Sequence, residues 1–272
     1  MVNKTPLWTA KKYLGQHFLV AEDVKTAIVQ SCPPHADMIL EIGPGAGAIT
    51  QMLPALQKPV WAIEIDERFI PSLQELLGVD HVLHTDALNV DYTSLLKKFR
   101  APWIVSNMPY NIAAPLMRKL LEQTQVAGIT LMMQKEMAQK VLLLPPKNGM
   151  NSLGILWQSW WEVTKICHVG PQGFRPRPKV DSTVLFFTPR RSPLLPLPEI
   201  LPWENFLRQL FHFKRKQLSS VLCKMGWPKT QINTISAQLK LSPQLRAEAL
   251  KIQQIKDLYQ ACSSNKFPGP LA

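Results

Sequence analysis

The sequence has few cysteines, no long apolar run and no recognisable targeting segment. Its four cysteines are widely separated in 272 residues and form no C-x-x-C pair, so neither a zinc knuckle nor a disulfide framework is indicated. No stretch approaches the roughly 18 unbroken apolar residues of a membrane helix, and the N-terminal segment lacks the apolar core of a signal peptide. These absences predict a soluble protein of the reducing cytoplasm.

Acidic charge is also scarce, and its distribution is uneven. The formal net charge is +12, with 31 Lys and Arg against 19 Asp and Glu. Residues 1–93 carry a net charge of −5, residues 94–190 one of +9 and residues 191–272 one of +8. A basic half is typical of a protein that binds a polyanion such as nucleic acid, although Lys and Arg that only solvate the surface would give the same balance.

The length and composition fit a folded protein of about two domains. Apolar types make up 46% of the residues and charged types 18%, which excludes disorder for most of the chain. The first two thirds alternate short apolar, β-rich runs with helix-length segments, a pattern that predicts βαβ units and a mostly parallel sheet in a doubly wound α/β domain. The expected strands are 38–42, 60–65, 81–84, 103–107, 129–134 and an antiparallel one within 180–187 at the end of the sheet. The expected helices between them are 46–56, 66–77 and 115–123.

A proline-rich stretch separates this region from a helical one. Five prolines lie between Thr188 and Trp203, a density that disfavours both helix and central strand. The pattern beyond it is purely helical. We therefore expect two domains, residues 1–190 and residues 191–272.

A glycine-rich turn follows the first expected strand. Gly43, Gly45 and Gly47 follow the acidic Glu41, and glycine suits positions where a ligand approaches the main chain or where φ is positive. This turn alone is ambiguous, because Gly43-x-Gly45-x-x-Ala48 also satisfies the dinucleotide-binding pattern and would allow a nicotinamide dehydrogenase.

Two acidic residues follow later strands of the same predicted sheet. Glu64 ends the second strand, 21 residues after Gly43, where a carboxylate can accept hydrogen bonds from both hydroxyls of a ribose. Asp86 follows the third strand and can accept a hydrogen bond from an adenine amine. Together with the turn, these acids indicate a cofactor that contains a nucleoside.

The sequence Asn107-Met-Pro-Tyr110 ends the fourth expected strand. An exocyclic adenine nitrogen is a poor nucleophile, because its lone pair is delocalised into the ring. The Asn107 side-chain oxygen and the Met108 carbonyl could each accept one of its N–H groups, and Tyr110 offers a face on which an extruded base can stack. This motif favours methylation of adenine by a cofactor that carries an activated methyl group.

The chain resembles the ribosomal RNA adenine N6,N6-dimethyltransferases from about Lys11 to the C-terminal helices. The motifs that carry the resemblance are Lys12-Tyr-Leu-Gly-Gln-His-Phe-Leu19, Leu40-Glu-Ile-Gly-Pro-Gly-x-Gly47, Ala-Ile-Glu-Ile-Asp66, Asp86-Ala-Leu, Asn107-x-Pro-Tyr-Asn-Ile, Met-Gln-Lys-Glu136 and Phe174-x-Pro-x-Pro-Lys-Val-Asp-Ser182. The resemblance implies a Rossmann-like class I methyltransferase domain with a small C-terminal helical domain. It also implies S-adenosylmethionine as the cofactor and dimethylation of two adjacent adenines in a hairpin near the 3′ end of small-subunit ribosomal RNA, with a role in subunit biogenesis.

The resemblance also assigns roles to individual residues. The cofactor-binding residues it implies are His17, Leu19, Gly43, Gly45, Glu64, Asp86 and Asn107. Asn107, Tyr110 and Phe174 would act on the target, with the two aromatic rings enclosing the adenine. No metal is implied. Met108 departs from the leucine usual in the family but still offers its carbonyl.

A basic cluster in the helical region completes the predicted sites. His212, Lys214, Arg215 and Lys216 lie at an expected helix start and would hold the RNA or the immature small subunit, with the protein acting as a monomer. Two further readings stay open at the level of sequence. One is an adenine methyltransferase that acts on large-subunit RNA, and the other is a non-catalytic ribosome-assembly or transcription factor that retains the fold.

Overall fold

The computed structural model describes most of the chain, which folds into two compact units. The described residues are 9–143, 149–213, 215–242 and 244–264, without the side chains of Lys12 and Ser264. The first unit comprises Met1–Ala138 and Glu162–Pro189, and the second comprises Gln139–Trp161 and Arg190–Ala272. The division after Pro189 lies beside the expected domain boundary, but residues 139–161 belong to the second unit rather than to the first.

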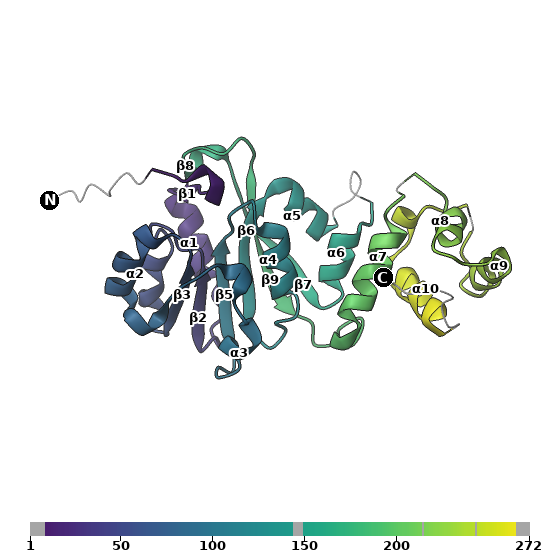
Figure 1. The fold of residues 1–272 in the computed structure, drawn as a ribbon, viewed down its shortest axis with the longest axis horizontal. Helices are drawn as coiled ribbons and strands as arrows, with labels where there is room; N and C mark the ends of the chain where they lie inside the picture. Colours follow the sequence, from purple (N-terminus) through teal and green to yellow (C-terminus); the bar gives the residue numbers. More distant parts are fainter. Residues whose placement is uncertain (1–8, 144–148, 214, 243, 265–272) are drawn as a thin grey trace. The chain divides into compact units, whose positions relative to one another are not determined.

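A seven-stranded mixed sheet forms the centre of the first unit (Figure 1). In spatial order its strands are β4 (Val82–His84), β3 (Val60–Glu64), β2 (Met38–Ile42), β5 (Pro102–Asn107), β6 (Gly128–Gln134), β9 (Ser182–Pro189) and β7 (Trp161–Val169). The pairs from β4 to β6 are parallel, and β9 pairs antiparallel with β6. The parallel strands are nearly continuous apolar runs, which is expected for strands that are covered on both faces.

The chain reverses its direction of winding between β2 and β5. From β2 it proceeds outward through β3 to β4, and it then returns to the other side of β2 as β5. In a doubly wound sheet, the crevice for a ligand opens at the carboxyl ends of the strands beside this switch point. The loops after β2, β3 and β5 therefore define where a functional site should lie.

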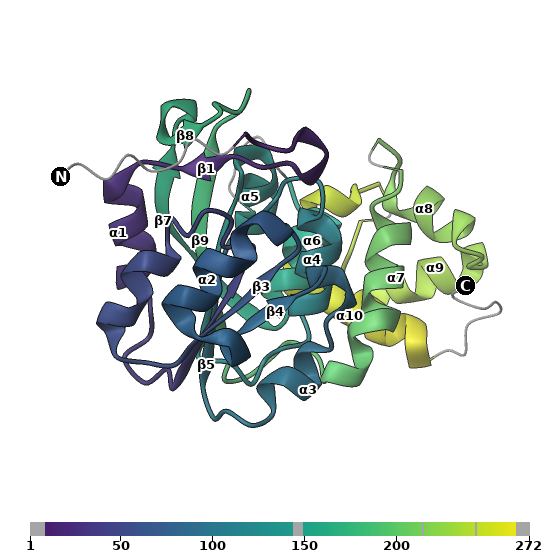
Figure 2. The ribbon, with the colours of Figure 1, turned by 60° about the vertical axis from the view of Figure 1, so that its left-hand side comes forward.

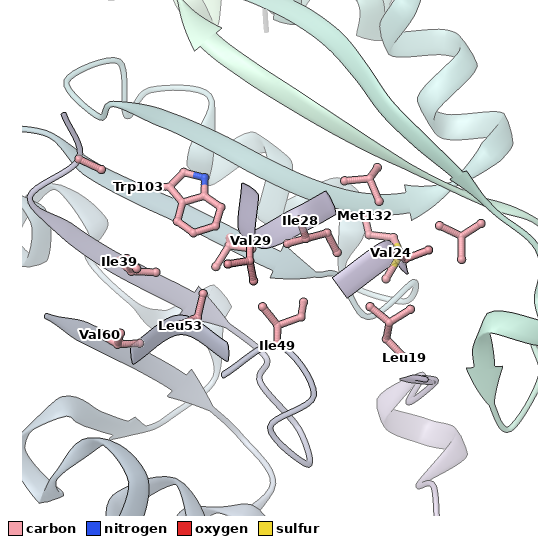
Figure 3. Packing of buried hydrophobic residues seen from close by; sticks show 14 of the residues in the cluster. Leu19, Val24, Ile28, Val29, Ile39, Ile49, Leu53, Val60, Trp103 and Met132 are labelled. Atoms are coloured by element: carbon pink, nitrogen blue, oxygen red, sulfur yellow. The ribbon is translucent and has the colours of Figure 1, made fainter. Parts of the chain in front are cut away.

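Buried aliphatic side chains attach the first helix to one face of this sheet. Val24 and Ile28 of α1 (Glu22–Gln30) belong to the same buried cluster as Ile39 of β2 and Trp103 of β5, and Figure 3 shows these side chains together. The other helices that follow strands of this unit are α2 (Ile70–Leu77), α3 (Tyr92–Leu96), α4 (Ala113–Leu120) and α5 (Lys135–Leu142), the last of which continues into the second unit. The short 3₁₀ segments are η1 (Lys12–Leu14), η2 (Thr50–Leu56), η3 (Glu67–Phe69), η4 (Val79–His81), η5 (Ala87–Asn89) and η6 (Pro171–Gly173).

Two expectations from the sequence were wrong in this unit. Residues 46–56 do not form an α-helix but a series of turns followed by η2, because glycines with positive φ precede this segment and Pro54 lies inside it. β9 is not at the end of the sheet, since β7 lies beyond it. β7 escaped prediction because its WEVTKICHV sequence mixes exposed and half-buried positions without a long apolar run.

A two-stranded antiparallel sheet joins the N-terminal segment to residues far along the chain. Phe18 and Leu19 form β1 (Phe18–Leu19), which pairs with β8 (Phe174–Arg175). Figure 2 shows the two strands side by side. This pairing fixes the segment before α1 next to the loop that leads into β9.

The second unit is helical and has an aromatic core. Its elements are α6 (Ser152–Gln158), η7 (Leu197–Glu199), α7 (Ile200–Leu210), α8 (Leu218–Lys224), α9 (Lys229–Gln238), η8 (Ala247–Ala249) and α10 (Ile252–Ser264). Trp203 of α7 packs against Tyr259 of α10 with ring centroids 5.0 Å apart, and its indole nitrogen donates to the Ser159 hydroxyl. Residues 139–161 therefore belong here because they complete a helical core that the sequence pattern does not reveal. Across the described ranges of both units, no helix is long and apolar enough to cross a membrane.

Candidate cofactor and methyl-transfer site

A cavity lies at the carboxyl ends of the strands beside the switch point. Its walls include Glu41 near the end of β2, Gly43 after that strand, Glu64 at the end of β3 and Asn107 at the end of β5. Residues 14–19 of the N-terminal segment also line it. The structure thus brings the glycine turn, the two predicted acids and the Asn-x-Pro-Tyr motif to one place, because parallel strands end at the same edge of the sheet.

The amide groups of the glycine turn already donate hydrogen bonds within the protein. Gly43 and Gly45 have φ values of +70° and +55°, which glycine adopts without strain. The Gly43 amide donates to the Ile63 carbonyl at 2.9 Å, the Gly45 amide to the Glu64 carboxylate at 2.8 Å and the Gly47 amide to the Pro44 carbonyl at 3.0 Å. These amides are therefore not presented to a phosphate, as they would be in a dinucleotide-binding loop.

Glu64 is buried and oriented by two main-chain amides. One carboxylate oxygen accepts from the Gly45 amide and the other from the Asp66 amide, at 2.8 and 2.7 Å. Burial raises the pKa of Glu64, and these hydrogen bonds oppose that effect. Each carboxylate oxygen can accept a further hydrogen bond, so the side chain remains able to bind ribose hydroxyls.

Glu41 is a buried carboxyl group in the wall of the same cavity. Its side chain is 2% exposed, and its Oε2 atom has no hydrogen-bond partner in the structure. Burial raises the pKa of Glu41 to about 8. An unpaired buried carboxyl group is costly on its own, and it becomes favourable when a cationic ligand group lies beside it.

Asp86 also lines the cavity, directly before η5. Its Oδ1 atom accepts from the Leu88 amide at 2.8 Å and caps this short segment. The side chain is half-buried, so the second oxygen can face a ligand. Asp86 is thus the wall residue for which the sequence predicts a contact to an adenine amine.

The charge of the cavity discriminates between cofactors. The described residues that line it include the acids Glu41, Glu64 and Asp86 but no Lys or Arg, although the protein as a whole is strongly basic. A cavity lined by acids and by no Lys or Arg repels a diphosphate, and it suits a cofactor with sulfonium and ammonium groups, whose positive charge would favour the ionised form of Glu41. The residues that line the cavity therefore fit S-adenosylmethionine and disfavour a nicotinamide dinucleotide.

Asn107 faces the cavity with its orientation fixed. Its side-chain nitrogen donates to the His17 carbonyl at 3.1 Å, which leaves the amide oxygen as an acceptor toward a ligand. The Met108 amide donates to the Met132 carbonyl at 3.2 Å, and the Met108 side chain is buried. The turn is thus anchored to β6, and the Asn107 amide oxygen is held in the cavity wall.

Tyr110 and His17 form an aromatic edge beside this turn. Their ring centroids are 5.4 Å apart, with an angle of 32° between the ring planes. The Tyr110 hydroxyl shares a hydrogen bond of 2.7 Å with the buried Ser182 hydroxyl, and the His17 Nδ1 atom lies 2.9 Å from the Pro176 carbonyl oxygen. Both rings are therefore held in place where the cavity meets the surface.

The structure does not bring Phe174 into the cavity. Its side chain is completely buried in the hydrophobic cluster that contains Leu19 and Val24, and it is not among the residues that line the cavity. The pairing of β1 with β8 places Phe174 opposite Leu19, which does contribute to the wall. Phe174 therefore lies beside Leu19 in the hydrophobic cluster and presents no face to a base in the cavity.

The sequence did not predict a charged cluster that joins the N-terminal segment to the residues after β3. The Asp66 side chain is fully buried and accepts from the Lys11 ammonium at 3.1 Å, the Gln16 amide at 2.8 Å and Arg68 guanidinium nitrogens at 2.9 and 2.6 Å. These hydrogen bonds, led by the one from Arg68, hold the pKa of Asp66 far below its usual value. We refer to these four residues as the Asp66 cluster. The only signal in the sequence was an acid directly after a strand, which does not identify its partners.

The basic cluster of the second unit lies in a loop rather than at a helix start. His212, Arg215 and Lys216 are exposed in the turn between α7 and α8, and Lys214 lies outside the described residues. α8 begins only at Leu218, because the turn after α7 extends through Lys216. Within the described ranges, no group of three or more His, Cys, Asp or Glu side chains is arranged to hold a metal ion.

Comparisons with known proteins identify the family of the chain. The family model "Ribosomal RNA adenine dimethylase" matches residues 8–263. A ribosomal RNA small subunit methyltransferase A from Clostridium botulinum is 32% identical over 252 residues, which cover 91% of this chain and 92% of that protein. The protein of the same name from Hahella chejuensis is 33% identical over 252 residues, with 90% of both chains covered.

Solved structures confirm the predicted α/β fold class. A dimethyladenosine transferase from Plasmodium falciparum superposes with a TM-score of 0.77 at 26% identity and covers 92% of this chain and 99% of its own. The 23S rRNA methyltransferase ErmE superposes with a TM-score of 0.70 at 22% identity over 90% of this chain and 99% of its own, and it supports the fold alone. From the family match along nearly the whole chain and from the similarity of its relatives, the protein belongs to the ribosomal RNA adenine dimethylase family.

Proposed function

We propose that this protein uses S-adenosylmethionine to dimethylate the N6 amines of two adjacent adenines in a hairpin near the 3′ end of small-subunit ribosomal RNA. The observation that carries the proposal is an acidic cavity at the switch point, bordered by Asn107 and Tyr110. The bacterial relatives are named for the small subunit, which favours this RNA over a large-subunit target. All seven predicted cofactor-binding residues and Tyr110 line the cavity, which favours an enzyme over a non-catalytic assembly or transcription factor.

Three acidic side chains would hold the cofactor, which supplies an activated methyl group when bound. Glu64 would accept from the ribose hydroxyls, and Asp86 would accept from the adenine amine, as expected from their places at the ends of successive strands. Glu41 would lie near cationic groups of the cofactor, because it is the cavity carboxyl with an unpaired buried oxygen. Gly43 and Gly45 keep the main chain close to the cofactor without a side chain in the way.

Asn107 would act on the target amine and beside the cofactor. Its amide nitrogen is already bonded to the His17 carbonyl, so its oxygen is directed to accept an N–H of the adenine. A second acceptor would be the Met108 carbonyl. Two acceptors favour a pyramidal nitrogen with its lone pair available, and this interaction strengthens as the nitrogen becomes positively charged in the transition state.

Tyr110 would provide the stacking face for the extruded base. Its ring lies next to His17, and its hydroxyl is held by Ser182, so the face is preorganised. Phe174 lies in the same buried cluster as Leu19 and supports this part of the cavity wall. The predicted enclosure of the base by two aromatic rings is therefore replaced in our proposal by stacking on Tyr110 alone.

The partner we propose is the immature small subunit through its ribosomal RNA. The exposed loop with His212, Arg215 and Lys216 supplies positive charge for phosphates, as does the basic balance of the later two thirds of the chain. We propose that the protein acts in the cytoplasm as a monomer.

The substitution Asn107→Ala tests the assignment of the reacting site. Methylation of undermethylated small subunits should fall at least about 100-fold, the usual effect when one preorganised transition-state acceptor is lost. Binding of S-adenosylmethionine and of the subunits should change much less. The control is Asn89→Ala, because Asn89 is exposed and is not among the residues that line the cavity. Normal methylation by the Asn107→Ala variant would show that the reaction takes place elsewhere or that the protein is not the enzyme.

A further inference from the structure

A groove on the surface of the first unit adjoins the cofactor cavity. It shares Gly15 to Leu19 and Tyr110 with the cavity and continues along Arg175 to Val180. Its volume of about 1380 Å³ exceeds the roughly 300–1,000 Å³ of typical small-molecule sites. A groove of this size that leads to the Tyr110 ring suits a polymer rather than a second small ligand.

The charge of the groove is opposite to that of the cavity. Its charged lining consists of the basic residues Lys25, Arg175, Arg177 and Lys179 and the single acid Glu22. Lys25 already pairs with Glu22 at 2.7 Å, so the uncompensated charge is concentrated in residues 175–179. The boundary between negative and positive potential therefore runs beside Tyr110.

Arg177 and Lys179 are exposed and, among the described residues, have no ion-pair partner. The neighbouring Asp181 does not neutralise them, because it pairs with Lys135 at 3.0 Å. Prolines at 176 and 178 alternate with the basic residues and restrict the main chain between them. The positive charges are thus held on a stiff segment, which lowers the entropy that binding would cost.

We infer that this groove binds the phosphates of the RNA strand on either side of the target adenine. The base would enter the cavity at Tyr110 while Arg177 and Lys179 contact the backbone outside, and the exposed Val180 adds an apolar surface for a sugar or neighbouring base. The first unit thus holds its own RNA-binding surface, which acts independently of the basic loop between α7 and α8. This inference rests on the proposed function, since it names the surface that the RNA substrate contacts.

The double substitution Arg177→Gln and Lys179→Gln tests the inference. Binding should be measured between about 0.05 and 1 M salt, both to undermethylated small subunits and to an RNA hairpin with two adjacent adenines. Loss of two single-strand phosphate contacts should reduce the salt slope by about 1.4 and weaken binding about 10-fold at 0.15 M salt. The affinity for S-adenosylmethionine should stay within about twofold, because neither side chain lines the cavity.

A second double substitution controls for general electrostatics. Lys97→Gln and Arg100→Gln remove the same charge from exposed residues just before β5. These residues lie at the amino end of that strand, whereas the cavity lies at its carboxyl end. This variant should keep the salt slope of the wild-type protein. An equal loss in both variants, or an unchanged slope in the Arg177 and Lys179 variant, would overturn the inference. Weaker binding to subunits with unchanged binding to the hairpin would also overturn it, because the groove would then contact a ribosomal protein.

The wild-type protein separates this inference from the proposed function. If it methylates the subunits while the groove variant behaves like the control variant, only the groove assignment fails. If the wild-type protein methylates no RNA, the proposed function itself fails.

Discussion

The substitution Asp66→Asn should release the N-terminal segment from the mouth of the cofactor cavity. Asp66 joins Lys11 and Gln16 of that segment to Arg68 after β3, and its side chain is completely buried. Asparagine has nearly the same size but no charge, and its amide group would point a donor toward the donors of its partners. The segment that lines the cavity would therefore lose the charged acceptor of its Lys11 and Gln16 side chains.

The magnitude follows from the geometry of the cluster. Breaking a buried ion pair costs about 3–5 kcal/mol, and the partial exposure of the partners, 28% for Lys11 and 24% for Arg68, reduces this to about 2–3 kcal/mol. The two contacts to residues 11 and 16 account for about 2 kcal/mol of it, which corresponds to roughly 30-fold more frequent opening of the segment. Because the folded pKa of Asp66 is depressed, its stabilisation is present above the unfolded value of about 4 and is lost as the pH falls further.

Hydrogen exchange measures this opening directly. Amides of residues 10–17 should exchange about 30-fold faster in the variant at neutral pH, and S-adenosylmethionine should dissociate about 10-fold faster. The control is Glu122→Gln, which removes an exposed ion pair of 2.6 Å with Arg118 on α4 and should change stability by at most about 1 kcal/mol. Unchanged exchange of residues 10–17 in Asp66→Asn would refute the role of the cluster, whatever its effect on global stability.

Substitutions at three further residues probe the cavity itself. Glu64→Ala should weaken S-adenosylmethionine binding by about 1.5–3 kcal/mol in isothermal titration, the usual cost of deleting a charged acceptor, and an unchanged affinity would place the ribose elsewhere. Tyr110→Phe should keep most methylation because the stacking face, worth about 1–3 kcal/mol per base, remains, while Tyr110→Ala should lose it. The phenylalanine variant should also lose about 1 kcal/mol of stability through its missing bond to Ser182, measured by urea unfolding; activity as low as that of the alanine variant would assign a role to the hydroxyl. The pKa of Glu41 is about 8 in the folded protein, so between about pH 4.5 and 8 the native state binds more protons than the unfolded state. The free energy of unfolding should therefore fall as the pH rises through this range, by up to about 1.4 kcal/mol per pH unit. Glu41→Gln should remove this decline, and parallel pH profiles of the two proteins would contradict the assignment.

The sequence was sufficient to place the residues at the ends of the parallel strands. Glu64, Asp86 and Asn107 each follow an apolar run, and such runs end at the same edge of a parallel sheet, so their convergence follows from the topology. The family match confirms the interpretation based on the ordered motifs. These predictions succeed because strand order and direction alone determine where the residues lie.

Features that depend on side-chain direction could not be predicted in this way. Phe174 matches a motif, but only the register of β8 with β1 shows that its ring points into the hydrophobic cluster. The partners of Asp66 are up to 55 residues away in the sequence, and no periodicity signals them. Residues 139–161 belong to the helical unit through packing against residues far along the chain, such as Trp203 against Ser159, and the hydrophobic pattern of residues 139–161 does not show this.

The nature of the product tests the proposed function most directly. The purified protein should be incubated with tritiated S-adenosylmethionine and undermethylated small subunits, and the labelled nucleoside should then be identified after complete digestion of the RNA. We expect the label in N6,N6-dimethyladenosine, in the RNA of the small subunit, and we expect it to be absent with Asn107→Ala. Label in another nucleoside or in no RNA, from a protein that binds S-adenosylmethionine normally, would contradict the proposed function.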